Sequence, residues 1–124
     1  MPGTRVAQRF TILLVDDDDL VRSSLMGLLE AHDCRVLVAA SGAEALHLLA
    51  QNHVDVLFTD IIMPDLDGIA LAKEAKRLHP DLHIMFATGY YSRAAEAEAL
   101  GTLLFKPIRD GELGAILASV LPGG

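Results

Sequence analysis

Several polar residues that could take part in phosphoryl transfer each follow a short apolar segment. Asp16 and Asp17 come directly after one such segment, and Asp60 ends another. Thr88 and Lys106 follow two further segments. In phosphoryl transfer a carboxylate can act as the nucleophile, while a lysine and a hydroxyl hold the phosphoryl oxygens. Carboxylates held close together repel one another, and Mg²⁺, which binds carboxylates, waters and phosphoryl oxygens, relieves that repulsion. The residue types therefore predict magnesium-dependent phosphoryl transfer.

Each of these residues also has an ordinary structural interpretation. Asp18 or Asp19 is expected to cap a following helix, and further acidic residues would complement the dipole of that helix. A Thr-Gly or Lys-Pro pair taken alone is more often part of a turn than of an active site. However, an acidic pair, an aspartate, a threonine and a lysine each end a different segment, and this joint arrangement favours one shared site.

The apolar segments predict the strands of a parallel sheet. They are short and rich in branched residues, as strands buried on both faces are. We expect strands at Phe10–Val15, Val36–Ala39, Val54–Thr59, Ile84–Ala87 and Leu103–Phe105.

Helical patterns lie between these segments. Val21, Leu25 and Leu28 fall on one helical face, Ser41 and Glu44 have capping-box spacing, and further helices are expected at Gly68–His79, Ser92–Leu100 and around Leu113–Val120. The alternation predicts an α/β fold, a doubly wound five-stranded parallel sheet with helices on both faces. Ligands bind at the carboxyl ends of such strands, and the first and third strands are neighbours in the common short orders. Asp16, Asp17 and Asp60 are therefore expected to converge.

Composition narrows the class of protein. The chain has 124 residues, enough for one core, and we expect a flexible N-terminal lead at 1–9, a domain at 10–120 and a C-terminal tail at 121–124. Its net charge of -7 argues against direct nucleic-acid binding. A single cysteine, Cys34, and the lack of an apolar run of roughly 20 residues predict a cytoplasmic protein that does not enter a membrane.

Other residues with reactive side chains are better explained structurally. The segments Met63-Pro64 and Asp67-Gly68 have the composition of turns that lead into the third helix. Five histidines lie near helix ends and in loops without the spacing of metal ligands: His32, His47, His53, His79 and His83. We therefore expect no histidine metal site.

Four segments together resemble the signature segments of response-regulator receiver domains of two-component systems, a family that includes chemotaxis regulators. They are ILLVDDDD, LFTDIIMPDLDG, FATGY and LLFKPI, and the resemblance spans about Phe10 to Val120. It implies a flavodoxin-like sheet with strand order 2-1-3-4-5. It also implies a signalling module, rather than an enzyme acting on other substrates, that catalyses its own phosphorylation and dephosphorylation.

The same resemblance implies roles for individual residues. Asp60 would be the phosphoacceptor, receiving its phosphoryl group from a histidine kinase or a phosphotransfer protein. Asp17 would bind Mg²⁺ directly and Asp16 through water, while Asp60 and the carbonyl of Ile62 complete the metal ligands. Thr88 and Lys106 would contact the phosphoryl group, and the Lys106-Pro107 bond would be cis.

Two further roles follow from the resemblance. Thr88 and Leu103 would form the conformational switch, although Leu103 stands where many receivers have Tyr or Phe and cannot provide an aromatic rotamer switch. Ile62 and Tyr90 would flank the path of the hydrolytic water. Neither side chain can orient that water, so slow self-dephosphorylation is expected.

Other interpretations remain open. Asp17, Asp19 and Val21 match the DxDxV motif of haloacid-dehalogenase-like phosphatases, in which Asp17 would be the nucleophile, but the later acidic pair that binds the metal in those enzymes is not found after Lys106. An interaction module that no longer accepts phosphate is a third interpretation. The segments ATGY and LLFKP resemble receivers attached to hybrid kinases and favour a kinase-linked or phosphorelay role. A homodimer is compatible with the resemblance.

Overall fold

The protein forms a three-layered α/β structure. A computed structural model describes residues 10–32, 34–89 and 92–120. Its elements in chain order are β1 (Phe10–Val15), α1 (Asp19–Glu30), β2 (Cys34–Ala39), α2 (Gly42–Gln51), β3 (Val56–Asp60), α3 (Gly68–Leu78), β4 (His83–Thr88), α4 (Ala94–Leu100), β5 (Thr102–Phe105) and α5 (Asp110–Val120). The expectations for the lead at 1–9, the tail at 121–124 and Tyr90 lie outside the described residues.

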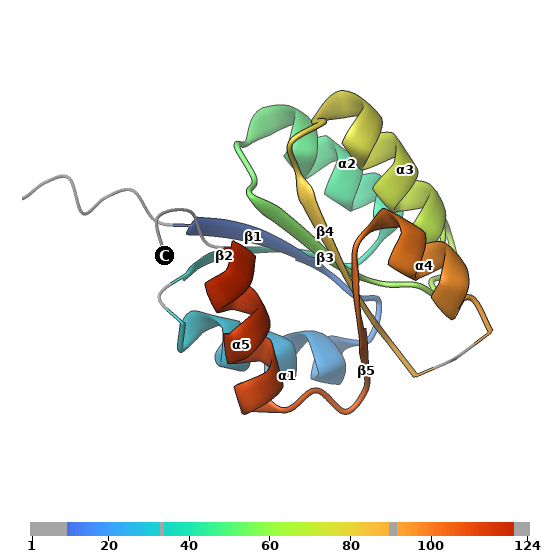
Figure 1. Cartoon of the computed structure of the whole chain (residues 1–124). Helices are drawn as coiled ribbons and strands as arrows, with labels where there is room; N and C mark the ends of the chain where they lie inside the picture. The colour runs from blue at the N-terminus through green and yellow to red at the C-terminus, as the bar shows by residue number, and fades with distance from the viewer. Residues whose placement is uncertain (1–9, 33, 90–91, 121–124) are drawn as a thin grey trace, which may run out of the picture.

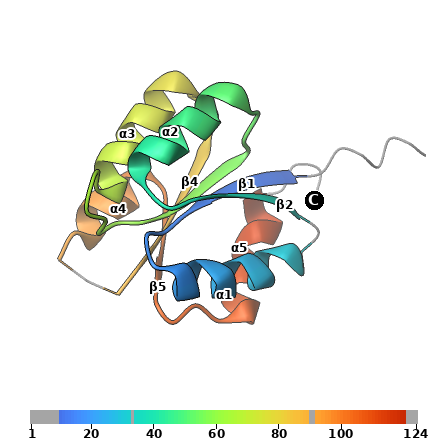
Figure 2. The same cartoon turned by 180° about the vertical axis from the view of Figure 1, so that it is seen from behind.

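The predicted doubly wound sheet is confirmed. Its five strands are parallel and lie in the order β2-β1-β3-β4-β5. Helices α1 and α5 cover one face of the sheet, and α2, α3 and α4 cover the other (Figures 1 and 2). This arrangement places the carboxyl ends of β1 and β3, which are hydrogen-bonded neighbours, side by side at one edge.

Both faces of the sheet are buried, and β1 shows why its sequence is uniformly apolar. Successive side chains of a strand point to opposite faces. Ile12 and Leu14 pack among residues of α1 and α5, whereas Leu13 and Val15 pack among residues of α2, α3 and α4. The central strands are therefore rigid supports for whatever follows their ends.

Most predicted strand boundaries were wrong by one or two residues, because backbone pairing continues through polar positions. β2 begins at Cys34, paired with Phe10, and β3 extends to Asp60, paired with Ala87. At the other end of β3 the prediction started too early. β3 begins at Val56, and the carboxylate of Asp55, just before it, accepts a hydrogen bond from Thr11 N of β1 at 2.8 Å.

The helix starts follow the predicted capping chemistry with one variation. Asp18 caps α1 by accepting hydrogen bonds from Leu20 N and Val21 N. Ser41 Oγ accepts from Glu44 N, as in a capping box, but the Glu44 carboxylate accepts from Ala40 N, one residue before the cap.

Within the described part of the chain, none of the helices has the length and apolar character needed to cross a bilayer.

Candidate functional site

Three carboxylates meet at the carboxyl edge of the sheet. Asp16 and Asp17 follow β1, and Asp60 is the last residue of the adjacent strand β3. Asp16, Asp17 and Asp60 each offer an oxygen within 4.8 Å of the others. Asp16 is buried, Asp60 is partly buried, and Asp17 is exposed. The structure therefore brings together the acidic residues whose convergence was expected from the strand order.

Lys106, which follows β5, reaches into this acidic cluster. Its Nζ lies 3.0 Å from Asp16 Oδ2 and 3.0 Å from Asp60 Oδ2. Burial alone would lower the pKa of the Lys106 ammonium group, but the hydrogen bonds and charges of Asp16 and Asp60 outweigh that effect and raise it. The lysine is therefore held in its charged form between two carboxylates.

The remaining carboxylate oxygens are held to different degrees. Asp16 Oδ1 accepts a hydrogen bond from Asp18 N at 2.9 Å, so both of its oxygens have protein partners. Asp60 Oδ1 accepts a longer bond, 3.3 Å, from Ile62 N. Asp17 has no hydrogen-bond partner within residues 10–32, 34–89 and 92–120. Asp60 and Asp17 are therefore the more available of the three carboxylates.

The chemistry of the cluster fits a magnesium ion. Mg²⁺ binds one or two carboxylates and keeps several waters, and a cluster with one exposed member leaves room for those waters. Three negative charges face the single positive charge of Lys106. A divalent cation would compensate the excess, and Asp17, which has no competing partner in the described residues, is suited to bind it directly.

The other predicted site residues lie on β4, on β5 and in the segment after β3. Thr88 ends β4, is fully buried, and accepts a hydrogen bond from Lys106 N through its main-chain carbonyl. The side chain of Ile62 is 44% exposed, just beyond Asp60. Leu103 is half-buried and packs against the core formed with α2, α3 and α4. The Lys106-Pro107 bond is cis, as the family resemblance implied.

The segment between β3 and α3 holds the main chain close to the acceptor strand. Gly68 N donates to Ile61 O at 2.7 Å, and a Cβ at Gly68 would lie 2.0 Å from the Asp60 carbonyl oxygen. Only glycine permits this approach. Asp67 caps α3, in agreement with a structural role for Asp67-Gly68. Asp65, in contrast, accepts hydrogen bonds from Gly42 N and Ala43 N in the first turn of α2.

Two arginines near the site were missed by the sequence analysis. Arg22 Nη1 donates to Asp16 O at 2.7 Å, and Arg22 Nη2 pairs with Asp19. Its position in the first turns of the helix after the acidic run was the available signal. Arg93 pairs with Glu96 and with Asp67 at 3.0 Å, and nothing in the sequence pattern indicated that contact.

The pairing of Arg93 with Asp67 also shifts the pKa values of both groups. Burial alone would raise the pKa of the Asp67 carboxyl, but the Ala70 amide and Arg93 lower it. The hydrogen bonds that Arg93 donates to Glu96 and Asp67 in turn raise the pKa of the Arg93 guanidinium group. Arg93 thus joins the segment before α3 to the start of α4 by a charged contact.

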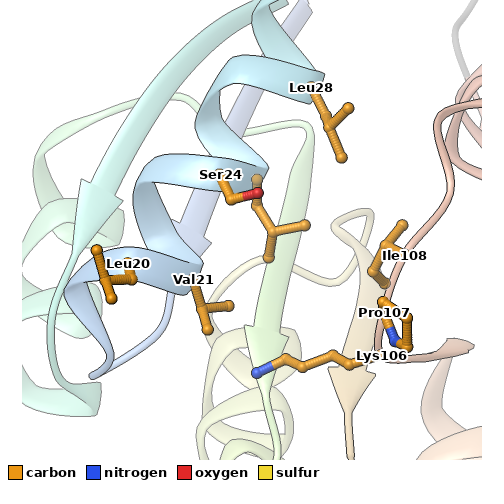
Figure 3. A pocket seen from close by; sticks show the side chains of 8 residues that line it. Leu20, Val21, Ser24, Leu28, Lys106, Pro107 and Ile108 are labelled. Carbon is orange, nitrogen blue, oxygen red and sulfur yellow. The ribbon is translucent and has the colours of Figure 1, made fainter.

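An apolar groove opens beside Lys106. It has a volume of about 460 Å³ and lies between α1 and the segment after β5. Figure 3 shows Val21 and Leu28 of α1 on the side toward Pro107 and Ile108, with Lys106 extending along one end. Leu20 is 82% exposed at the start of α1. An apolar groove therefore adjoins the lysine that contacts Asp16 and Asp60.

Comparison with known proteins identifies relatives along almost the whole chain. Residues 12–118 match the family described as the response regulator receiver domain. The chain is 34% identical, over 96% of its length, to the sensor kinase CckA of Brucella abortus, and spans 13% of that kinase. It is 40% identical, over 71% of its length, to the response regulator receiver protein CpdR of the same organism, and the match covers 73% of CpdR.

Solved structures agree with this family match. The signal receiver domain of an HD domain-containing protein from Pseudomonas fluorescens superposes with a TM-score of 0.84 at 29% identity, over 91% of this chain and 94% of that one. The chemotaxis protein CheY4 of Vibrio cholerae superposes with a TM-score of 0.82 at 28% identity, over 91% of this chain and 99% of that one. This chain therefore belongs to the response regulator receiver domain family of two-component systems.

Proposed function

We propose that this receiver domain accepts a phosphoryl group on Asp60 in a magnesium-dependent reaction. The observation that carries the proposal is the meeting of Asp60 with Asp16, Asp17 and Lys106 at the end of β3. The phosphoryl donor is a histidine of a kinase or a phosphotransfer protein. The reaction breaks the phosphorus–nitrogen bond of that histidine and forms a bond between phosphorus and an Asp60 oxygen, while the leaving imidazole takes up a proton.

The surrounding side chains have distinct tasks in this reaction. Asp60 Oδ1, held only by a 3.3 Å bond from Ile62 N, is the more available oxygen for attack. Lys106 Nζ lies 3.0 Å from Asp60 Oδ2 before transfer, and it then donates a hydrogen bond to the negatively charged phosphoryl oxygens. Asp17, Asp60 and the Ile62 carbonyl would hold Mg²⁺, with Asp16 acting through water, and the bound ion would supply positive charge that neutralises the transferring group.

The switch is proposed to run from Thr88 to Leu103. Thr88 is buried at the end of β4 and its hydroxyl turns toward the phosphoryl group. Leu103 lies on the neighbouring strand β5, half-buried, and repacks into the space that this movement leaves. The surface of α4 and β5 changes as a result, and binding of an output partner changes with it.

Access of the phosphoryl donor is supported by the apolar groove. A protein donor must bring a histidine to Asp60, and the groove lined by Leu20, Pro107 and Ile108 borders the lysine that contacts Asp60. Burying this surface would hold the donor in place during transfer. Similarity to the sensor kinase CckA and to CpdR supports a kinase-linked role.

The experiment is phosphorylation by acetyl phosphate with Mg²⁺, followed by intact-protein mass spectrometry. The parent should gain one phosphoryl group, and Asp60→Asn should gain none. Asp17→Asn should be phosphorylated more slowly but on Asp60. Peptide mapping separates the alternatives: modification of Asp17 would indicate the phosphatase-like chemistry, and no modification in the presence of Mg²⁺ would favour an interaction module.

A further inference from the structure

The two peptide units that flank Asp17 are each held by a hydrogen bond from or to a side chain. Asp17 is exposed and has no hydrogen-bond partner among the described residues, although its oxygen lies within 4.8 Å of those of Asp16 and Asp60. Its backbone is held on both sides. The peptide unit before it is bound through the Asp16 carbonyl by Arg22, and the unit after it is bound through Asp18 N by the Asp16 carboxylate.

Of these two contacts, only the one from Arg22 involves a side chain outside the acidic cluster. The Asp16 carboxylate belongs to the acidic cluster itself and also contacts Lys106. Arg22 lies outside the cluster, on α1, and Nη1 donates a charged 2.7 Å bond to a main-chain carbonyl. The Arg22 side chain is only 20% exposed and is also paired with Asp19. Its guanidinium group is therefore held at both ends.

We propose that Arg22 is a positioning residue for metal binding, fixing the Asp16–Asp17 peptide so that the Asp17 carboxylate points at the cation. This role rests on the proposed magnesium site and adds a residue that does not itself touch the metal. Outer partners that orient a metal ligand typically contribute about 10–100-fold to metal affinity. Because the contact is to the backbone rather than to the carboxylate, we expect a loss of about tenfold without Arg22.

A purely electrostatic role of Arg22 and a positioning role predict opposite changes in Mg²⁺ affinity when Arg22 is removed. If only its charge mattered, a positive group beside a cation site would repel Mg²⁺, and removing it would tighten binding. If Arg22 positions Asp17, removing it weakens binding. If Arg22 only supports the fold, removing it lowers the unfolding free energy and leaves Mg²⁺ affinity unchanged.

The test is titration of Mg²⁺ into the full chain by isothermal calorimetry, comparing the parent with Arg22→Met. Methionine keeps an unbranched stem and removes the guanidinium group. The matched control is Arg77→Met on α3, where an arginine is also paired with an acidic residue three positions earlier, Glu74, away from the cluster. We expect about tenfold weaker binding in Arg22→Met and parental affinity in Arg77→Met. Equal or tighter binding in Arg22→Met overturns the proposal.

A second variant keeps the test decisive if Arg22→Met does not fold, as judged by circular dichroism. Arg22→Lys conserves the net charge, but a shorter ammonium group cannot hold Asp16 O and Asp19 in the same two-ended arrangement. Weaker Mg²⁺ binding in Arg22→Lys then supports the proposal, and parental affinity overturns it. A parent that binds no Mg²⁺ overturns the magnesium site together with this inference, whereas failure of Arg22 alone leaves the proposed function intact.

Discussion

Replacing Lys106 with methionine should destabilise the metal-free protein and increase its response to Mg²⁺. The ammonium group lies 3.0 Å from oxygens of both Asp16 and Asp60, which are 2% and 13% exposed, respectively. Removing one partner of a buried ion pair typically costs about 3–5 kcal/mol, since a buried charge is left uncompensated. Lys106 is 23% exposed, so solvent screens part of the interaction. We therefore expect a loss of about 2–3 kcal/mol.

Magnesium should reverse much of this loss. The methionine side chain leaves the three carboxylates without the ammonium group that contacts Asp16 and Asp60, so a divalent cation meets less repulsion and is bound more tightly than in the parent. Ligand binding to the native state alone raises stability by about 2.7 kcal/mol when the ligand is at a hundred times its Kd. The stabilisation by a fixed Mg²⁺ concentration should therefore be larger in Lys106→Met than in the parent.

The assay is urea unfolding followed by circular dichroism, with and without Mg²⁺, because the chain has no tryptophan for fluorescence. Lys73→Met, on the exposed surface of α3, removes the same charge elsewhere and should behave like the parent. Asp17→Asn should remove the response to Mg²⁺ with little change in metal-free stability. The reasoning is refuted if Lys106→Met is as stable as the parent without Mg²⁺, or gains no more stability from it.

Two further predictions concern hydrolysis and pH. In the proposed phosphorylated state, Ile62→Asn and Tyr90→Glu should shorten the lifetime of the acyl phosphate, because an amide or carboxylate can orient the attacking water. Phosphoryl loss is measured after the donor is removed, and equal or slower loss in both variants would contradict this. Burial, and then the charge of Lys76, lower the pKa of His83 below 6.5, so the native state binds fewer protons there than the unfolded state. Stability should therefore decline as the pH falls below 6.5, and His83→Gln should decline less; identical pH profiles of unfolding free energy would show that His83 is not responsible.

The fold was predictable because its strands are buried on both faces. A strand such as β1, whose alternate residues pack on opposite helical layers, is apolar at nearly every position and is therefore conspicuous in the sequence. Strand ends were less predictable, since their limits depend on the partner strand. Asp60 pairs with Ala87 and Cys34 with Phe10, and no local pattern encodes those pairings.

The candidate site was predictable in its members but not in its contacts. The strand order brings the ends of β1 and β3 together, so the convergence of Asp16, Asp17 and Asp60 follows from topology. The contact of Lys106 with two carboxylates at once depends on how its long side chain crosses from β5. Likewise, Arg22 returns to the loop before its own helix, a contact that only the folded geometry specifies.

The charges at this edge of the sheet explain why a divalent ion suits the proposed reaction. Three carboxylates against one ammonium group leave two formal negative charges, and the two that Lys106 contacts are Asp16 and Asp60. Asp17 is the member without a partner in the described residues, so the uncompensated charge is greatest where solvent can reach it. A monovalent cation would leave the cluster negative and repel an incoming phosphoryl group, whereas a divalent one neutralises it. The repulsion among the three carboxylates, which opposes folding, is therefore also the source of the affinity of the cluster for the metal. Lys106 limits that repulsion by pairing with Asp16 and Asp60, and Asp17 is left as the open position for the ion.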